Sequence, residues 1–270
     1  YSAGNVSPRR QFAAPFDWTE AFTFGLPLTL VFGFAGLGAF WVCQAAPLQL
    51  SRMVRSLGIQ LLAAMISALL WLGVARGWAM LLVDTPGRGS SMYLKGIKTR
   101  ADYEVPGKAC IDYLVSRPEV DSNRVALLGI SMAGYYAPRV AAFDKRLKAL
   151  VAWSGCYSIL DDLYDWCVHL QPVCQRLLGG VSHEEARQQL KDFSMAGIAK
   201  NITCPTLITH GDKDTLMSVQ GAKKLFSEIG AQDKTLKIYG EAEGGGRIHC
   251  SHDYWTHNLP YMLDWLEERL

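Results

Sequence analysis

Short apolar runs, separated by charged or glycine-rich turns, recur through the second half of the chain. Four of them, at residues 125–128, 149–153, 205–210 and 235–239, have the length and composition of buried strands. Continuous apolar runs are typical of a parallel sheet that is covered on both faces. The pattern therefore predicts an α/β protein with a mostly parallel, doubly wound sheet.

The first of these runs leads into Gly129-Ile-Ser131-Met-Ala-Gly134, which is followed by a stretch of small residues typical of a helix. This order predicts a nucleophile elbow, a sharp strand-to-helix turn that holds a serine hydroxyl clear of the backbone. Small flanking residues keep such a strained turn free of side-chain clashes. We therefore expect Ser131 to act as the nucleophile in acyl-transfer chemistry.

A carboxylate and an imidazole follow the later runs, at the strand ends where an open α/β sheet gathers its chemistry. A serine hydroxyl is a weak nucleophile at neutral pH, so an imidazole must take its proton, and a carboxylate must hold that imidazole in the correct tautomer. We expect His249 to be the base and Asp214 the acid. Asp212 and His252, in the same two loops, remain open as alternatives.

Three motifs, at residues 76–89, 102–104 and 129–139, together resemble one subgroup of the α/β-hydrolases. The subgroup includes 2,6-dihydroxypseudooxynicotine hydrolase, the fungal chain-shortening hydrolases of naphthopyrone pigment synthesis and the esterase-like proteins once named after a fermentation-respiration switch. The resemblance runs from about residue 76 to the C-terminus and implies an α/β-hydrolase fold. It also implies that Ser131 is the nucleophile, Asp214 the acid and His249 the base. Cys250 matches a cysteine that commonly follows the base in this group.

Acyl transfer also needs two backbone N–H donors for the oxyanion of its tetrahedral intermediate. In this fold one donor comes from the residue after the nucleophile and the other from a loop after the third strand. We expect Met132 to supply the first and a loop around Gly33 to supply the second. The glycine-rich signature that family members carry in that loop is not cleanly present here.

The first quarter of the chain is its most apolar part. Residues 21–50 and 56–75 contain no charged side chain, and both stretches are long enough to span a bilayer. A membrane hairpin is therefore one interpretation. We favour the other, in which residues 16–83 supply two strands and the first helix of the sheet, because buried parallel strands also read as continuous apolar runs.

The expected domain organisation places a helical cap insert within one hydrolase core. Residues 1–20 would be the remnant of a helical segment that family members carry ahead of the core, residues 21–153 its first part, residues 154–203 the cap and residues 204–270 its second part. Helical spacing covers 157–170 and 182–190 of the cap, and the latter stretch opens with a capping box of Ser182 and Glu185.

This cap would cover Ser131 and contribute aromatic side chains to the substrate pocket. The candidates for binding an aromatic or acyl substrate are Trp153, Tyr157, Tyr164 and Trp166. The alternative is that these side chains only pack the cap onto the sheet. Three further cap residues are expected on a solvated helix face, namely Asp161, Asp162 and Asp165.

Composition narrows the classes of function. With 27 Lys and Arg against 25 Asp and Glu, the net charge of +2 predicts no attraction to nucleic acid. Seven cysteines, an odd number without regular spacing, favour a reducing compartment, and with no secretory signal we expect a cytoplasmic protein. No His, Cys and Asp grouping has the spacing of a zinc or iron site, so we expect neither a metal nor a cofactor. The oligomeric state is not indicated.

These features predict a serine hydrolase that acts on a small-molecule substrate. The bond cut would be that of an ester or, as the resemblance implies, the carbon–carbon bond of an activated ketone. Two alternatives remain. One is a catalytically idle or weakly active, membrane-associated hydrolase-like protein that no longer builds an oxyanion hole. The other is a prolyl-peptidase-like serine peptidase, since those catalytic domains share the elbow.

Overall fold

The computed structural model describes residues 77–243 and 245–270, and its centre is a four-stranded parallel sheet with the order β1-β2-β3-β4. The strands are β1 (Ala126–Ile130), β2 (Ala149–Trp153), β3 (Thr206–Gly211) and β4 (Lys234–Tyr239). Each predicted strand is therefore confirmed, with its ends displaced by at most two residues.

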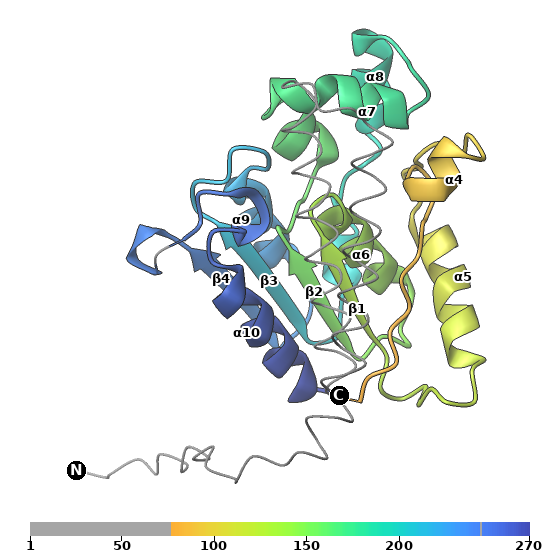
Figure 1. Cartoon of the computed structure of the whole chain (residues 1–270), viewed down its shortest axis with the longest axis vertical. Coiled ribbons are helices and arrows are strands. Elements are labelled where there is room, and N and C mark those ends of the chain that lie inside the picture. Colours follow the sequence, from red (N-terminus) through yellow and green to blue (C-terminus); the bar gives the residue numbers. More distant parts are fainter. Residues whose placement is uncertain (1–76, 244) are drawn as a thin grey trace, which may run out of the picture. The chain divides into compact units, whose positions relative to one another are not determined.

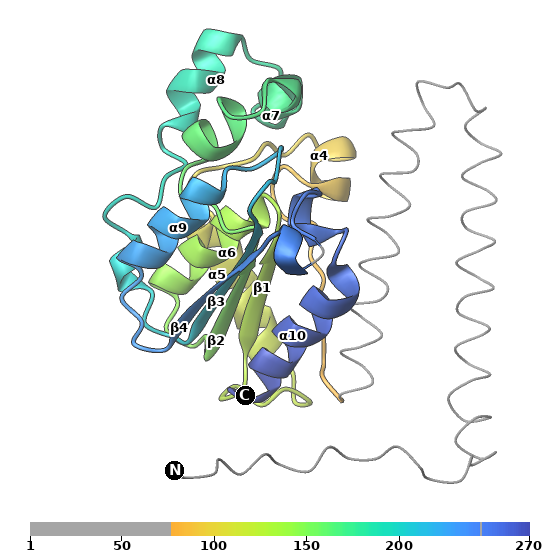
Figure 2. The ribbon, with the colours of Figure 1, turned by 90° about the vertical axis from the view of Figure 1, so that its left-hand side faces the viewer.

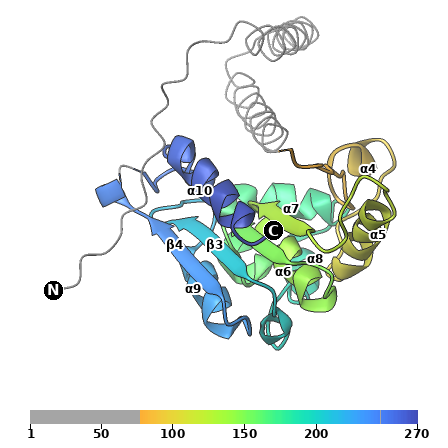
Figure 3. The same cartoon turned by 90° about the horizontal axis from the view of Figure 1, so that it is seen from below.

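Helices cover both faces of this sheet, as Figures 2 and 3 show. On one face, α6 (Ala133–Phe143) packs against β1 and β2, and α9 (Val219–Glu228) packs against β3 and β4. On the other face, α10 (Trp255–Glu267) packs against β2 and β3. Helix α5 (Glu104–Val115) packs beside α6. The prediction of a parallel, doubly wound α/β sheet is thereby confirmed.

The core extends without a break from the sheet into the insert. All residues of β2 are buried, because β1 and β3 flank it and helices cover both of its faces. Fully buried large side chains include Leu150 of β2 and, from the insert, Ile159 and Tyr164. Burial of each such aliphatic side chain stabilises the fold by about 1.5–3 kcal/mol. The insert therefore shares the core of the sheet.

The insert after β2 is made of short helices and stands at the end of the sheet where β2 finishes (Figure 1). The predicted helix at 182–190 is confirmed as α8 (His183–Leu190), with both hydrogen bonds of the Ser182–Glu185 capping box formed. The predicted continuous helix at 157–170 is wrong. The chain there is broken into the π-helical η2 (Leu160–Tyr164) and the 3₁₀ helix η3 (Val168–Leu170), and α7 (Gln171–Leu177) follows.

The apolar segment at 78–83 does not form the strand expected near the end of the first quarter. Its side chains at Met80, Leu81, Leu82 and Val83 are 37%, 38%, 56% and 47% exposed. Beyond β1 the described sheet has no further strand, so this segment pairs with none of the described strands. The other expectations for residues 1–76, including the segment at 1–20, the two sheet strands and the membrane hairpin, lie outside the described residues.

No helix in residues 77–243 and 245–270 combines the length and the apolar composition needed to cross a bilayer.

Candidate active site

Ser131 lies on a sharp turn between the end of β1 and the start of α6. Its φ of 60° is in the left-handed region, a strain of order 1–3 kcal/mol for a residue other than glycine. The turn is held because the Ser131 N–H donates to the carbonyl of Trp153 at 2.9 Å. A Cβ at Gly129 would lie 2.2 Å from the carbonyl oxygen of Ala133, and a Cβ at Gly134 would lie 2.3 Å from that of Ser154. Both glycines are therefore needed for the close packing around the turn.

His249 and Asp214 meet Ser131 in a continuous chain of hydrogen bonds. The Ser131 Oγ lies 2.6 Å from His249 Nε2, and His249 Nδ1 lies 2.7 Å from Asp214 Oδ2. The serine and the histidine are 118 residues apart in the sequence. Asp214 follows β3, and His249 begins the short helix η6 (His249–Ser251) after β4. The sheet thus brings together side chains from the ends of three strands.

Asp214 is held as an anion by its surroundings. The carboxylate is 3% exposed, and its Oδ1 accepts the N–H groups of Leu216 at 2.9 Å and Met217 at 3.1 Å. Burial alone would raise the pKa of Asp214, but its hydrogen bond to His249 and the neighbouring positive charge lower it below the ordinary value. The carboxylate is therefore ionised at neutral pH.

The pKa of His249 is raised above that of a free imidazole. Burial alone would lower this pKa, whereas interactions with the adjacent Cys250 sulfur and with the Asp214 carboxylate favour the charged ring and outweigh burial. An imidazolium at this position is therefore stabilised, which is the property required of a base that carries a proton between two steps.

The two alternatives for the acid and the base lie elsewhere. In the described part of the chain, His249 hydrogen-bonds to Asp214 and not to Asp212, whose side chain is exposed. Ser131 hydrogen-bonds to His249 and not to the half-buried His252. His252 therefore has no contact through which it could take the serine proton.

Of the two expected oxyanion donors, one is described. Met132 directly precedes α6, where main-chain N–H groups lack an intrahelical acceptor. Its role as an oxyanion donor stays a prediction. The second candidate, Gly33, lies outside the described residues.

The four aromatic candidates for substrate binding have separate surroundings. Trp153 is fully buried in β2, and Tyr157 donates its hydroxyl to Glu228 of α9 at 2.8 Å. The Tyr164 hydroxyl lies 3.0 Å from His183 Nδ1 of α8, and Trp166 is 52% exposed. For the three buried residues Trp153, Tyr157 and Tyr164, these contacts favour the alternative in which the side chains pack the insert, whereas Trp166 is exposed; a pocket lined by the four stays a prediction.

Trp153 has a role that the sequence analysis missed. Its carbonyl accepts the Ser131 N–H, and its indole Nε1–H donates to the Cys250 carbonyl at 2.7 Å. Cys250 itself has a φ of 58°, so the loop that carries His249 is held in a strained conformation. One buried residue therefore ties the serine turn to the histidine loop. Its place at the end of a strand beside the elbow was the signal available in the sequence.

Asp162 corrects a second expectation, since it does not lie on a solvated face. It is 8% exposed, and its carboxylate accepts the N–H groups of Tyr157 at 2.9 Å and Ser158 at 2.8 Å. A Cβ at Gly221 of α9 would lie 2.1 Å from this carboxylate. Asp162 lies in the π-helix η2, and its carboxylate binds two backbone N–H groups at the start of the insert. Asp161 and Asp165 are exposed, as expected.

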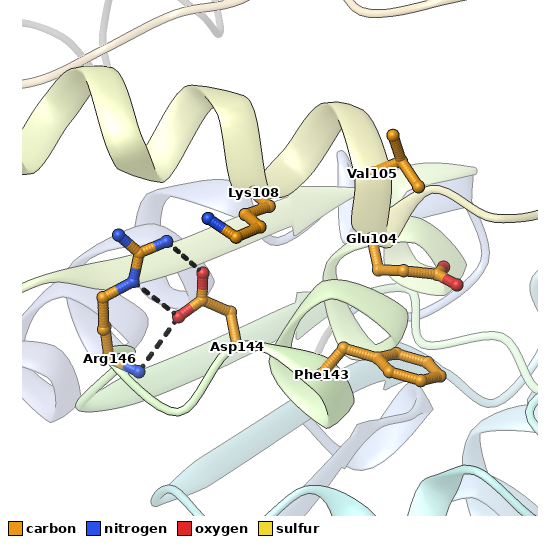
Figure 4. A pocket seen from close by; sticks show the side chains of 6 residues that line it. All are labelled: Glu104, Val105, Lys108, Phe143, Asp144 and Arg146. Atoms are coloured by element: carbon orange, nitrogen blue, oxygen red, sulfur yellow. Dashed lines mark hydrogen bonds and ion pairs between the residues drawn. The ribbon is translucent and has the colours of Figure 1, made fainter.

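A cavity of about 340 Å³ lies between α5 and the end of α6 and contains none of the predicted site residues. Figure 4 shows its lining of Glu104, Val105, Lys108, Phe143, Asp144 and Arg146. Both cations are already paired, Arg146 with Asp144 and Asp112, and Lys108 with Asp112. The cavity therefore offers no free charge to a ligand. Among the described residues, no three His, Cys, Asp or Glu side chains are grouped so that they could hold a metal ion.

Known proteins resemble this chain in both sequence and structure. The sequence model of the prolyl oligopeptidase family matches residues 71–270. The 2,6-dihydropseudooxynicotine hydrolase of Paenarthrobacter nicotinovorans is 28% identical over 197 residues, covering 72% of this chain and 51% of that protein. Hydrolase ORFZ of Pyricularia oryzae is 38% identical over 207 residues, covering 61% of this chain and 45% of that protein.

The crystal structure of 2,6-dihydroxy-pseudo-oxynicotine hydrolase superposes with a TM-score of 0.61 at 26% identity, covering 69% of this chain and 51% of that one. The predicted α/β-hydrolase fold and the predicted subgroup are thereby confirmed. The chain spans about half the length of the curated relatives it matches.

Proposed function

The chain belongs to the prolyl oligopeptidase family, and from this premise we propose that it is a serine hydrolase. Its substrate is a small aromatic or acyl compound that contains an ester or an activated ketone. The observation that carries the proposal is the pair of hydrogen bonds, 2.6 Å and 2.7 Å long, that joins Ser131 through His249 to Asp214. The six described cysteines carry free thiols, consistent with the cytoplasmic location that the sequence predicts.

The reaction begins when Ser131 Oγ adds to the substrate carbonyl carbon and His249 Nε2 takes the hydroxyl proton. The oxyanion that forms accepts a hydrogen bond from the Met132 N–H. Asp214 keeps the proton of the ring on Nδ1, so that Nε2 is the basic nitrogen, and it stabilises the imidazolium. Collapse of the tetrahedral species expels the leaving group, which takes the proton from Nε2, and leaves an acyl ester on Ser131.

Water completes the cycle by attacking this acyl ester while His249 removes its proton. The same steps serve an ester and an activated ketone, because the leaving atom is an alkoxide oxygen in one and an enolate carbon in the other. The likeness to 2,6-dihydropseudooxynicotine hydrolase supports the ketone as well as the ester.

A substrate panel tests the proposal with the purified full chain. It consists of p-nitrophenyl esters of several acyl lengths, an aromatic 1,3-diketone and a peptide p-nitroanilide. We expect turnover of an ester or of the diketone, and we expect a fluorophosphonate to block it. Turnover of none of these compounds contradicts the proposal, and turnover of the peptide amide alone supports the peptidase alternative.

Substitution of Cys250 by alanine is expected to change the pH dependence of the reaction. His249 acts as a base only when neutral, and its raised pKa places the acidic limb of kcat/KM above the value of about 6.5 for a free imidazole. Removal of the Cys250 sulfur, whose interaction with the ring contributes to this increase, shifts the limb to lower pH. Profiles of kcat/KM from about pH 5 to about pH 10 measure the shift. A limb that stays in place or moves to higher pH contradicts this assignment.

A further inference from the structure

Arg88 is a cation beside the nucleophile elbow that the proposed mechanism does not use. It directly precedes the short helix α4 (Gly89–Tyr93). Its guanidinium donates to the carbonyl of Gly87 at 3.2 Å and to the thioether sulfur of Met132, and its Cζ lies 5.6 Å from the centre of the Tyr136 ring. Because Met132 follows Ser131, this charge contacts the neighbour of the nucleophile.

The guanidinium has no anionic partner in the part of the chain that the structure describes. Its acceptors are one carbonyl and one thioether, and a thioether is a weak acceptor for a group with five N–H donors. Arg139 on α6 differs, since it forms a two-pronged ion pair with Glu104. Among the described residues, this half-buried arginine has N–H donors without an acceptor, and it contacts the residue that follows Ser131, so it is suited to bind an anion.

Three described neighbours of Arg88 do not neutralise it. Burial raises the pKa of Tyr103, Tyr136 and Cys174, so these neighbours carry no charge at neutral pH. Tyr103 and Tyr136 are stacked with their ring centres 3.6 Å apart, and Tyr136 donates its hydroxyl towards Met132 at 3.3 Å. Arg88 therefore lies beside the stacked rings of Tyr103 and Tyr136, in surroundings of low polarity where its charge is little screened.

The backbone of this loop is fixed before any ligand binds. The Arg88 N–H donates to the carbonyl of Thr85, and the Gly87 N–H donates to that of Ile97, both at 3.0 Å. Gly87 has a φ of 79°, and a Cβ there would lie 2.6 Å from the Cβ of Thr99, so only glycine fits. A preformed loop reduces the entropy that a ligand must lose on binding.

We propose that Arg88 binds a carboxylate of the substrate, so that this enzyme prefers esters or ketones with a carboxylate a few bonds from the scissile carbonyl. The planar fork of a guanidinium matches the two oxygens of a carboxylate, and such charge-assisted pairs are among the stronger hydrogen bonds. The inference rests on the proposed function and adds the class of substrate to it. Monoesters of dicarboxylic acids are the simplest members of that class.

The test compares mono-p-nitrophenyl glutarate with the neutral p-nitrophenyl pentanoate, using the full chain. In the wild type, we expect kcat/KM to favour the anionic ester by about tenfold to a hundredfold. Arg88→Met abolishes most of this preference, and Arg88→Lys retains part of it because the charge remains while the fork is lost. The control is Arg117→Met, which removes an exposed arginine paired with Glu119 and leaves the ratio unchanged.

Two further measurements separate the possible outcomes. Labelling by a neutral fluorophosphonate reports on Ser131 whatever the charge of the substrate. Comparison of the inhibition constants of glutarate and pentanamide for the wild type tests the preference for an anion without any variant. If the wild type is labelled but prefers neither the anionic ester nor the anionic inhibitor, this inference alone is overturned. The same holds if Arg88→Met is folded by circular dichroism and keeps the wild-type ratio of kcat/KM for the anionic and the neutral ester. Absence of both labelling and turnover overturns the proposed function, and the inference with it.

Discussion

Replacement of Ser131 by alanine is expected to lower kcat/KM by about 10⁴-fold or more, because loss of a serine nucleophile leaves only binding and oxyanion stabilisation. No other hydroxyl is described within hydrogen-bonding distance of His249 Nε2. The serine already adopts the left-handed conformation, so alanine adds little strain and the fold is retained. Steady-state kinetics on the best substrate of the panel, with circular dichroism as the measure of folding, provide the test.

Ser154 provides a matched control for this substitution. It also lies at the end of a strand, is fully buried, and has a φ of 59°. Its hydroxyl has no hydrogen-bond partner among the described residues. Ser154→Ala therefore imposes the same chemical change on a similar backbone, and we expect kcat/KM within a few-fold of the wild type. Equal activity losses in the two variants would contradict the role of Ser131.

Replacement of Asp214 by asparagine is expected to lower kcat by about 10³–10⁴-fold, while KM changes little. Asparagine preserves the size of the side chain and its acceptor oxygen. It removes the negative charge that stabilises the imidazolium, and its NH₂ group can hold His249 in the wrong tautomer. The loss should be confined to the chemical steps, because Asp214 is buried and reaches the substrate only through His249.

The neighbouring Asp212 is the control for this change. It lies in the same loop, but its side chain is exposed and does not pair with His249. Asp212→Asn should keep kcat near that of the wild type. If Asp212→Asn were the slower of the two variants, Asp212 would be the acid and the assignment made here would be wrong.

Much of the fold could be predicted because its signals are local. The first two strands are short apolar runs between turns, and a strand in the middle of a parallel sheet must be apolar on both faces. The elbow was equally visible, since Gly129 and Gly134 occupy positions where a Cβ would collide with the backbone. The capping box at Ser182 depends on residues only three positions apart.

The features that were missed depend on contacts between distant segments. Asp162 is buried because its carboxylate binds the backbone N–H groups of Tyr157 and Ser158 and lies against Gly221 of α9. Trp153 joins the serine turn to the histidine loop through a hydrogen bond that spans 97 residues. Residues 78–83 have the composition of a strand, but a strand also needs a partner, and none is described beside them. Apolar patterning carries no information about these pairings.

Peptide mass spectrometry after reaction with a fluorophosphonate is the most direct test of the central claim. We expect one phosphonyl adduct, carried by the peptide that contains Ser131. The adduct forms more slowly as the pH falls, because His249 becomes protonated. A protein that stays unmodified, or an adduct on a different residue, would contradict it.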